Sequence, residues 1–515
     1  MKSISARVLS GTSMGFLNLA VMMGQTILLV PILLHFWGGE TYGIWLSVIA
    51  LGMMFTTFDT GHQQYLLNRF NMRYPTEGAV GVQQDIADGL RMAMVLGGAQ
   101  ALIALILTLC GLSTRVFGLE LEGGLISVAN AAFLVFVLSW WIRGSVSGIL
   151  AKLYVTRGDY TRSQLWAIWN QITRLGTITC CAVLGADVFI TMIAFCLISM
   201  VNSAAMFVDI WKRYPDFIPW WSGGSFRRGF LNLRRSVVLT ANGFLQQLSL
   251  SGLILLVGAI LGAVVVPAFT TIRTVANLFA QATNIFLAPL APDMSRFHVT
   301  GQKDKLGTTF AICWLINGIT VNAAILLTLF FIEPLYGWWT QEKLGFSWPL
   351  YLSCNLSVSL INFGAPFVAY LKSINNLQAL LLITVSRGVL VFGGAFVLLP
   401  LLGASGAGLA LILGEVPASC LIPLVYCRDL VFSEVMLRSA VAAAINLIIM
   451  GATFIAISIN GDWSYVFVSL ALLCLAVSAL VQWNVLPRVG KERLYQILVK
   501  VQYSAAKVFG RFKEA

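Results

Sequence analysis

The chain has 515 residues, of which 58% are hydrophobic and only 10% are charged, whereas about 25% of the residues of a soluble globular domain are charged. With a mean hydropathy of +0.85, this composition excludes a soluble protein. The formal net charge of +12 is scattered over many short segments and forms no single basic patch, so the sequence also argues against a nucleic-acid-binding protein.

Apolar stretches long enough to cross a bilayer recur along the whole chain. A spanning helix needs about 20 mainly apolar residues, and on this basis we predict an all-α integral membrane protein with about 14 spans. The first span is too long for the apolar region of a cleaved signal peptide, so we expect it to be retained. The predicted spans are 8–35, 41–67, 85–111, 124–150, 164–184, 188–211, 235–262, 265–293, 306–332, 348–371, 376–400, 403–427, 438–459 and 463–486.

The distribution of basic residues predicts the orientation of the chain. Lys and Arg are enriched in cytoplasmic loops. When the N-terminus is placed inside, 26 of the 33 Lys and Arg residues fall in cytoplasmic segments, and only Arg115 and Lys343 fall in external ones. We therefore predict that both termini are cytoplasmic.

An internal repeat indicates two related halves. Gly15-Phe16-Leu17 aligns with Gly243-Phe244-Leu245 at an offset of about 227 residues, and the order of further matches is kept. Since matched segments lie six spans apart, the halves share one orientation and are related by an axis along the membrane normal. The alternative is chance similarity among apolar helices.

The repeat predicts five parts of the chain. The tail combines an apolar stripe at helical spacing with many basic residues, so we expect it to contact an anionic leaflet, with a solvated tail as the alternative. The parts are an N-lobe at 1–211, a cytoplasmic interfacial linker at 212–233, a C-lobe at 234–430, an extra helix pair at 431–487 and the basic amphipathic tail at 488–515.

Five arginines fall within predicted spans. An Arg near the bilayer centre costs about 2.5–3.5 kcal/mol on the insertion scale, so five of them cannot all face lipid. Those nearest the cytoplasmic ends could instead extend to the interface; these are Arg91 and Arg143. The others are Arg174, Arg273 and Arg387.

Arg174 and Arg387 stand near the middle of spans five and eleven, which the repeat relates. Arginine keeps its charge and offers a planar fork that matches phosphate and carboxylate groups. We therefore predict that the arginines line an anion-binding cavity, with these two on opposite walls of a cleft between the lobes. The alternative is that the arginines hold helices together by pairing with buried carbonyl groups or with Asp59, Asp209 or Glu415.

Two acids lie within spans, and they have two interpretations. Asp59 and Glu415 could couple transport to protons or sodium, or could pair with an arginine. The excess of arginine argues against a cationic substrate. No G-x-x-x-x-G-K-[ST] motif occurs, and the three histidines form no metal-binding pattern, so we predict no ATP site, no cofactor and no metal.

Short motifs at two places resemble a known family. They resemble the polysaccharide repeat-unit (O-antigen) flippases of the multidrug/oligosaccharidyl-lipid/polysaccharide exporter superfamily. The first place is similar to that family's first hairpin, and the second to its span-twelve signature. The motifs are Pro31, Gly38-Gly39-Glu40, Tyr42-Gly43-Ile44-Trp45 and Asp59-Thr60-Gly61 at the first place, and the stretch from Pro400 to Ala410 with Glu415 at the second.

The resemblance implies two six-helix bundles that alternate access to a central Arg-lined cavity. The implied substrate is a polyprenyl-pyrophosphate-linked oligosaccharide, moved across the bacterial cytoplasmic (inner) membrane, and the implied partners are polysaccharide polymerase or assembly proteins. A peptidoglycan-precursor flippase and a drug or metabolite exporter of the same superfamily remain alternatives. A membrane glycosyltransferase or polymerase is disfavoured, because the external loops near 112–123 and 333–347 are short and no D-x-D motif occurs.

Overall fold

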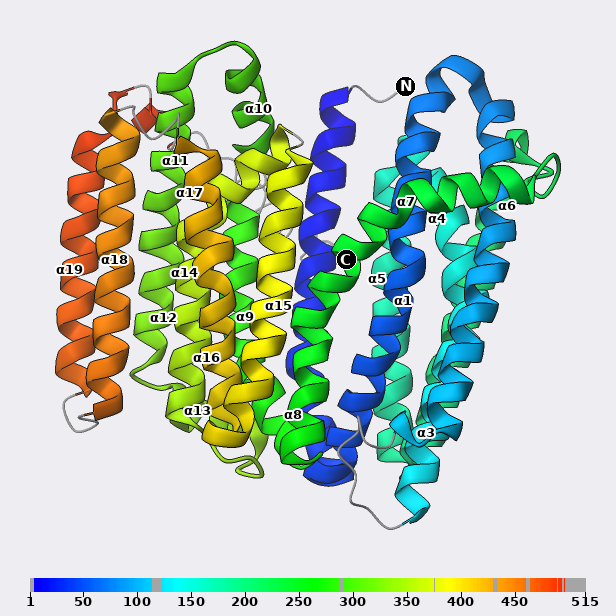
Figure 1. Ribbon diagram of the computed structural model, residues 1–515, viewed down its shortest axis with the longest axis horizontal. Coiled ribbons are helices and arrows are strands. Elements are labelled where there is room, and N and C mark those ends of the chain that lie inside the picture. The colour runs from blue at the N-terminus through cyan, green and yellow to red at the C-terminus, as the bar shows by residue number, and fades with distance from the viewer. Residues whose placement is uncertain are drawn as a thin grey trace, which may run out of the picture. The chain divides into compact units, whose positions relative to one another are not determined.

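The computed structural model describes residues 4–113, 123–287, 290–374, 376–428, 434–459, 464–488, 490–492 and 495. Within these residues all regular structure is helical (Figure 1), which confirms the predicted all-α fold class. The predicted amphipathic tail at 488–515 lies almost entirely outside the described residues and stays a prediction.

The first three predicted spans form one composite helix, α1 (Ile4–Leu109). It is broken at Gly38 (φ 74°) and Gly78 (φ 64°), where the backbone enters a left-handed region that glycine adopts without a Cβ penalty. These breaks divide α1 into three helical parts that match spans one to three.

The chain then continues through helices that are interrupted by short π-helical segments. The elements up to the middle of the chain are α3 (Gly123–Trp140), η1 (Trp141–Val146), α4 (Ser147–Thr156), α5 (Tyr160–Val183), α6 (Val188–Arg213), the 3-10 turn η2 (Pro215–Phe217), α7 (Phe226–Gln247), η3 (Leu248–Gly252) and α8 (Leu253–Leu261).

The second half follows the same plan and ends with a helix pair. Its elements are α9 (Val265–Leu287), α10 (Ala291–Val299), α11 (Lys303–Asn317), η5 (Gly318–Asn322), α12 (Ala323–Thr328), α13 (Ile332–Thr340), α14 (Trp348–Ser373), α15 (Leu377–Leu402), α16 (Ala404–Glu415), η6 (Val416–Leu421), α17 (Ile422–Tyr426), α18 (Glu434–Ile459) and α19 (Ser464–Val485).

Ten described helices, one of them the composite α1, are long and apolar enough to cross a membrane. The more polar α5 and α9, which carry Arg174 and Arg273, are not among them. When the parts of α1 are counted separately and helices joined by π segments are counted once, the described helices other than the short α10 and α13 correspond to the fourteen predicted spans.

The chain forms two compact units, residues 1–267 and 268–515. α7 and α8 belong to the first unit because they pack closely on α1. A Cβ on Gly61 would lie 2.4 Å from the Thr240 Cα, and a Cβ on Gly43 would lie 2.1 Å from the Ala263 carbonyl oxygen. The boundary between the two units therefore lies after the linker predicted at 212–233. The lobe boundaries that the repeat predicts stay a prediction.

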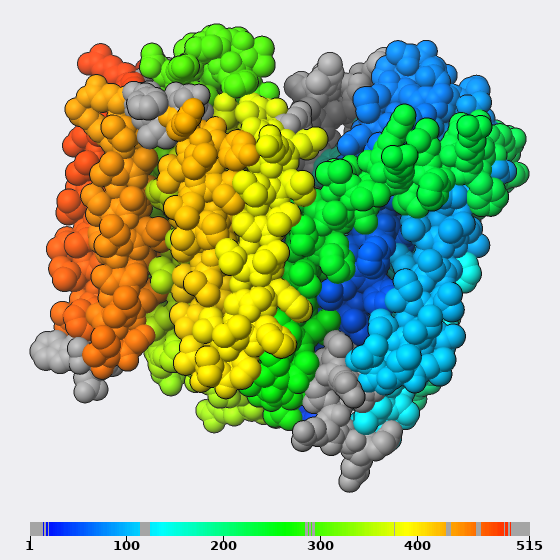
Figure 2. Space-filling view, viewed as in Figure 1, coloured from blue at the N-terminus to red at the C-terminus, as the bar shows by residue number. Residues whose placement is uncertain are grey.

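Each unit has its own core. In unit 1, the segment after α6 is part of that core: Tyr214, Phe217 and Trp220 are buried against Phe70 and Tyr154. Burial raises the pKa of the Tyr214 hydroxyl to about 12. In unit 2, the aromatic side chains of α11 and α14 form the centre of the core, and α18 packs beside α19 (Figure 2).

Candidate substrate and coupling sites

Arg143 lies in the π-helical segment η1 and is 6% exposed. Its Nε donates to the Ser139 Oγ at 3.1 Å, and its Cζ lies 5.0 Å from the centre of the Phe136 ring and 5.3 Å from that of Trp140. Its Nη2 is buried and has no hydrogen-bond partner. The wide turn of a π segment often occurs at functional sites, and here it carries a charge into an aromatic environment.

Arg174 reaches the same aromatic group from α5. Its Nε donates to the Ser199 Oγ of α6 at 2.9 Å, and its Cζ lies 5.0 Å from the centre of the Phe195 ring. The Cζ of Arg143 lies 5.5 Å from the same ring, so Phe195 contacts both arginines. Within the described part of the chain, no carboxylate lies within ion-pairing distance of either guanidinium. Unit 1 therefore holds two adjacent positive charges that lack a counter-charge.

Arg387, the position in unit 2 that the predicted repeat relates to Arg174, has a different environment. Its Nε lies 2.7 Å from Glu415 Oε1, and its Nη2 donates to Glu415 Oε2 at 2.9 Å. The Ser419 Oγ of η6 donates to the same carboxylate at 2.6 Å. Glu415 is 5% exposed. The structure thus shows at Arg387 the ion pair that the sequence left as an alternative.

Small residues bring α15 and α16 close enough for this pair. A Cβ on Gly414 would lie 2.3 Å from a Val391 methyl carbon and 3.2 Å from the Arg387 carbonyl oxygen. Small residues at helix contacts allow backbones to approach within membranes. Gly406, at the start of α16 in the stretch that carries part of the family resemblance, also has a packing role, because a Cβ there would lie 2.3 Å from the Leu398 carbonyl oxygen.

The other two arginines lie elsewhere. Arg273 on α9 is 7% exposed, with its Cζ 5.7 Å from the centre of the Phe269 ring. Arg91, in the first half of the third part of α1, donates through Nη1 to the Gly224 carbonyl oxygen and lies over the Phe226 ring. Arg91 therefore belongs to the contacts that hold the start of α7.

Asp59, on the second part of α1, is 2% exposed. Its Oδ2 accepts hydrogen bonds from Trp140 Nε1 at 2.9 Å and from the Ser145 Oγ at 2.5 Å. No Lys or Arg within the described ranges lies within ion-pairing distance of it. Trp140 donates a hydrogen bond to Asp59, and its ring contacts the Arg143 guanidinium. The Trp140 side chain therefore lies in contact with both buried charged residues.

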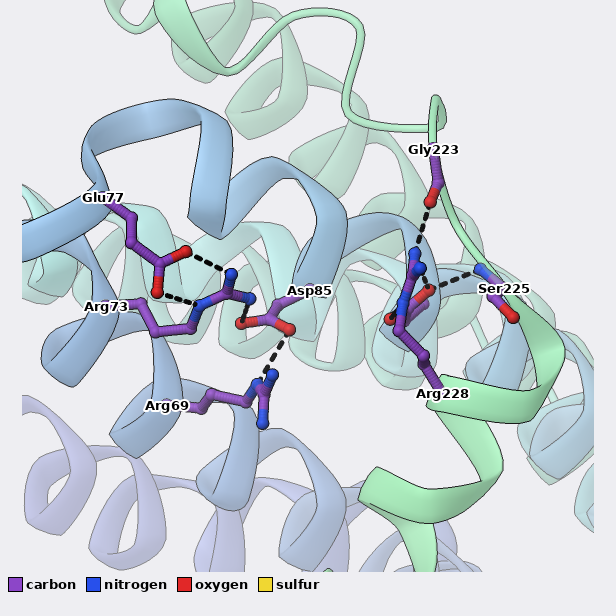
Figure 3. Close-up of polar contacts among 8 residues, drawn as sticks. Arg69, Arg73, Glu77, Asp85, Gly223, Ser225 and Arg228 are labelled. Atoms are coloured by element: carbon purple, nitrogen blue, oxygen red, sulfur yellow. Dashed lines mark hydrogen bonds and ion pairs between the residues drawn. The ribbon is translucent and has the colours of Figure 1, made fainter.

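Around the break of α1 at Gly78, acids and bases pair closely (Figure 3). Arg69 and Arg73 each contact Asp85 at 2.8 Å, and Arg73 also pairs with Glu77. Asp209, another proposed partner for an intramembrane arginine, instead pairs with two arginines at the helix ends, Arg162 at 2.9 Å and Arg213 at 2.8 Å.

Several of these contacts could not be predicted from the sequence. Trp140, Ser145, Ser199 and Ser419 look like ordinary span residues, and hydropathy does not reveal a π segment. No group of three His, Cys, Asp or Glu side chains in the described residues could hold a metal ion.

Comparison with known proteins relates the chain to a group of transporters by fold. Neither a family model nor a curated protein matches its sequence. The structure of the lipid II flippase MurJ, in an inward closed conformation, matches with a TM-score of 0.65 at 12% identity, over 92% of this chain and 98% of that one.

Two multidrug transporters also match. The MATE multidrug transporter DinF-BH matches with a TM-score of 0.60 at 14% identity, over 84% of this chain and 98% of that one. An inward-facing MATE family transporter of the MOP superfamily matches with a TM-score of 0.57 at 16% identity, over 80% and 98%. The chain is a multi-pass membrane protein with the fold that MATE transporters and MurJ share.

Proposed function

We propose that the chain is a flippase that moves a polyprenyl-pyrophosphate-linked oligosaccharide across the bacterial cytoplasmic membrane by alternating access, with both termini in the cytoplasm. The observation that carries this proposal is the pair Arg143 and Arg174, two buried or half-buried guanidiniums without a carboxylate partner in the described residues. The fold supports transport, since the similar structures are of transporters and a flippase.

The chemistry of the pair fits a pyrophosphate group. A guanidinium in a membrane is costly unless a counter-charge or polar environment accompanies it. A pyrophosphate supplies several acceptor oxygens and negative charge, and the arginine fork donates to them bidentately. The free Nη2 of Arg143 is a donor available for this contact. Arg387 is less suited to the same task, because Glu415 already neutralises it.

We also propose that Asp59 carries the coupling ion. An ionised carboxylate buried in a membrane protein needs a cation partner or a proton, and the hydrogen bonds from Trp140 and Ser145 bring no positive charge. Glu415, the other intramembrane acid, has Arg387 as its partner. Binding of a proton or sodium ion at Asp59 could be transmitted to Arg143 through Trp140, which contacts both.

The test is complementation of a deletion strain. Arg174→Ala and Arg143→Ala should reduce surface polysaccharide and cause the lipid-linked oligosaccharide to accumulate on the cytoplasmic side, while protein levels stay normal. Arg213→Ala, an exposed arginine with an acidic partner, is the matched control and should complement fully. Full complementation by both Ala variants and their combination would overturn the proposed substrate site. Normal polysaccharide in the deletion strain, with altered drug susceptibility, would favour a drug exporter of the same superfamily.

A further inference from the structure

The helical segment formed by α7, η3 and α8 is longer than a membrane crossing requires. It runs over 36 residues, from Phe226 to Leu261, or about 54 Å at 1.5 Å per residue, whereas the hydrocarbon layer is about 30 Å thick. A substantial part of the segment must therefore lie outside that layer or along its boundary. The sequence prediction began this span at residue 235 and missed the first turns of α7.

The start of α7 is held firmly against α1. Asp88, which is 1% exposed, accepts a hydrogen bond from the Ser225 backbone N–H at 2.5 Å and one from Arg228 Nε at 3.0 Å. Arg228 also donates to the Gly223 carbonyl oxygen (Figure 3). The carboxylate thus caps the helix from another element, where negative charge also favours the helix dipole.

One face of these first turns is buried and has small or polar side chains. Gly229, Asn232 and Ser236 are buried, and a Cβ on Gly229 would lie 2.8 Å from the Asp88 carbonyl oxygen. This close approach fixes which face of the helix is turned outward.

The outward face is both apolar and basic. Phe226, Phe230 and Val237, which are 59%, 64% and 55% exposed, follow one another at helical spacing. Arg227, Arg234 and Arg235 are also exposed, and none has an ion-pair partner in the described residues. The first half of α7 runs crosswise over the neighbouring helices of unit 1 (Figure 1) and lies at the surface (Figure 2).

We propose that residues 226–237 form an interfacial helix that binds the anionic phospholipids of the cytoplasmic leaflet. The two phenylalanines enter the acyl boundary, and the three arginines contact lipid phosphates. An amphipathic helix with aromatic and basic residues has this orientation in membranes, and each basic residue near an anionic surface strengthens its binding about five-fold. The unpaired arginines favour phospholipid over an apolar protein partner, because a phosphate supplies the missing charge.

The experiment uses the full chain in nanodiscs made of phosphatidylcholine alone or with phosphatidylglycerol. Hydrogen–deuterium exchange of the peptide that covers 226–237 should be at least about five-fold slower when phosphatidylglycerol is present. Replacing the three arginines together (R227Q, R234Q and R235Q) should abolish this difference. Phe230→Ser should raise exchange of the same peptide in both lipids.

A matched control removes three other exposed bases from segments predicted to be cytoplasmic, Lys212, Lys303 and Lys305, as K212Q, K303Q and K305Q. This variant should keep the dependence on phosphatidylglycerol, and exchange within α14 should be unchanged in every variant, which shows that the fold is intact. Equal exchange in both lipids for the unmodified chain would overturn the proposal. A lipid dependence that the control triple also removes would do so too, because it would be an effect of total charge.

Discussion

The two arginines that the predicted repeat relates, Arg174 in unit 1 and Arg387 in unit 2, have opposite electrostatic environments. Arg387 forms an ion pair and a hydrogen bond with Glu415, and Ser419 is a further donor to that carboxylate. Arg174 contacts a hydroxyl and an aromatic ring. Unit 2 therefore carries a neutralised arginine, and unit 1 carries one without a carboxylate partner in the described residues.

The intramembrane acids of the two units, Asp59 and Glu415, also differ in their environments. Unit 2 joins its intramembrane acid directly to its arginine, whereas unit 1 places Trp140 between Asp59 and Arg143. A buried pair is already satisfied and changes little during a cycle, while separated charges can each bind something else. This difference supports the proposal that unit 1 binds the anion and the coupling ion, although the two arginines look equivalent in the sequence.

The largest expected effect is the loss of stability when the pair in unit 2 is broken. Glu415→Met should lower the free energy of unfolding by about 3 kcal/mol, because Arg387 cannot lose its charge. Arg387→Met should cost less, since an unpaired Glu415 can take up a proton. The double variant should be close to wild type, because an apolar pair replaces a buried ion pair.

Thermal unfolding of the purified variants in detergent measures these differences, and protein levels in cells provide a second readout. If the destabilisation of the double variant equals the sum of the two single effects, the two side chains are not coupled, and the contrast between the units fails.

The second effect concerns transport and unit 1. Arg174→Ala should lower the rate of substrate translocation about ten-fold or more, the value of one lost charge-assisted hydrogen bond. Its stability should change little, because the Ser199 hydroxyl also donates to the Phe195 carbonyl oxygen and keeps a partner. Arg174→Lys should restore part of the rate, since it keeps the charge but not the fork.

Translocation of lipid-linked oligosaccharide into the outer leaflet of vesicles is the measurement. An Arg174→Ala variant that is degraded while Arg387→Met is stable would reverse the comparison between the units.

The third effect tests whether Asp59, in contrast to Glu415, couples transport to an ion gradient. Asp59→Asn keeps an oxygen that accepts from Trp140 and Ser145 but cannot exchange a proton or attract a cation. We expect the protein to remain folded and transport to lose its dependence on a pH or sodium gradient. Initial rates in vesicles with imposed gradients test this. If transport by Asp59→Asn still depends on the gradient, Asp59 is not the coupling site.

The sequence predicted the number and positions of the membrane-spanning helices well, because each span can be recognised from its own length and hydropathy. It did not predict α7 before residue 235, since Arg227, Arg228, Arg234 and Arg235 lower the hydropathy there and mark an interface helix instead. The sequence also did not predict which side chains contact Arg387 and Asp59. These contacts depend on π segments and on close contacts at glycines such as Gly414, which determine side-chain position across helices and leave no periodic signal in the chain.

The smallest expected effect compares two serines that donate to the two acids. Ser419→Ala and Ser145→Ala each remove one hydrogen bond to a buried carboxyl group, at 2.6 Å and 2.5 Å, and each should cost about 1 kcal/mol of stability. Their effects on transport should differ. Glu415 keeps Arg387 as its partner, so Ser419→Ala should translocate substrate at the wild-type rate. Asp59 keeps the uncharged donor Trp140, so Ser145→Ala should change the pH profile of transport. Equal pH profiles for both variants and wild type would show that the environment of Asp59 is as passive as that of Glu415, and that an acid without a basic partner is not by itself a coupling site.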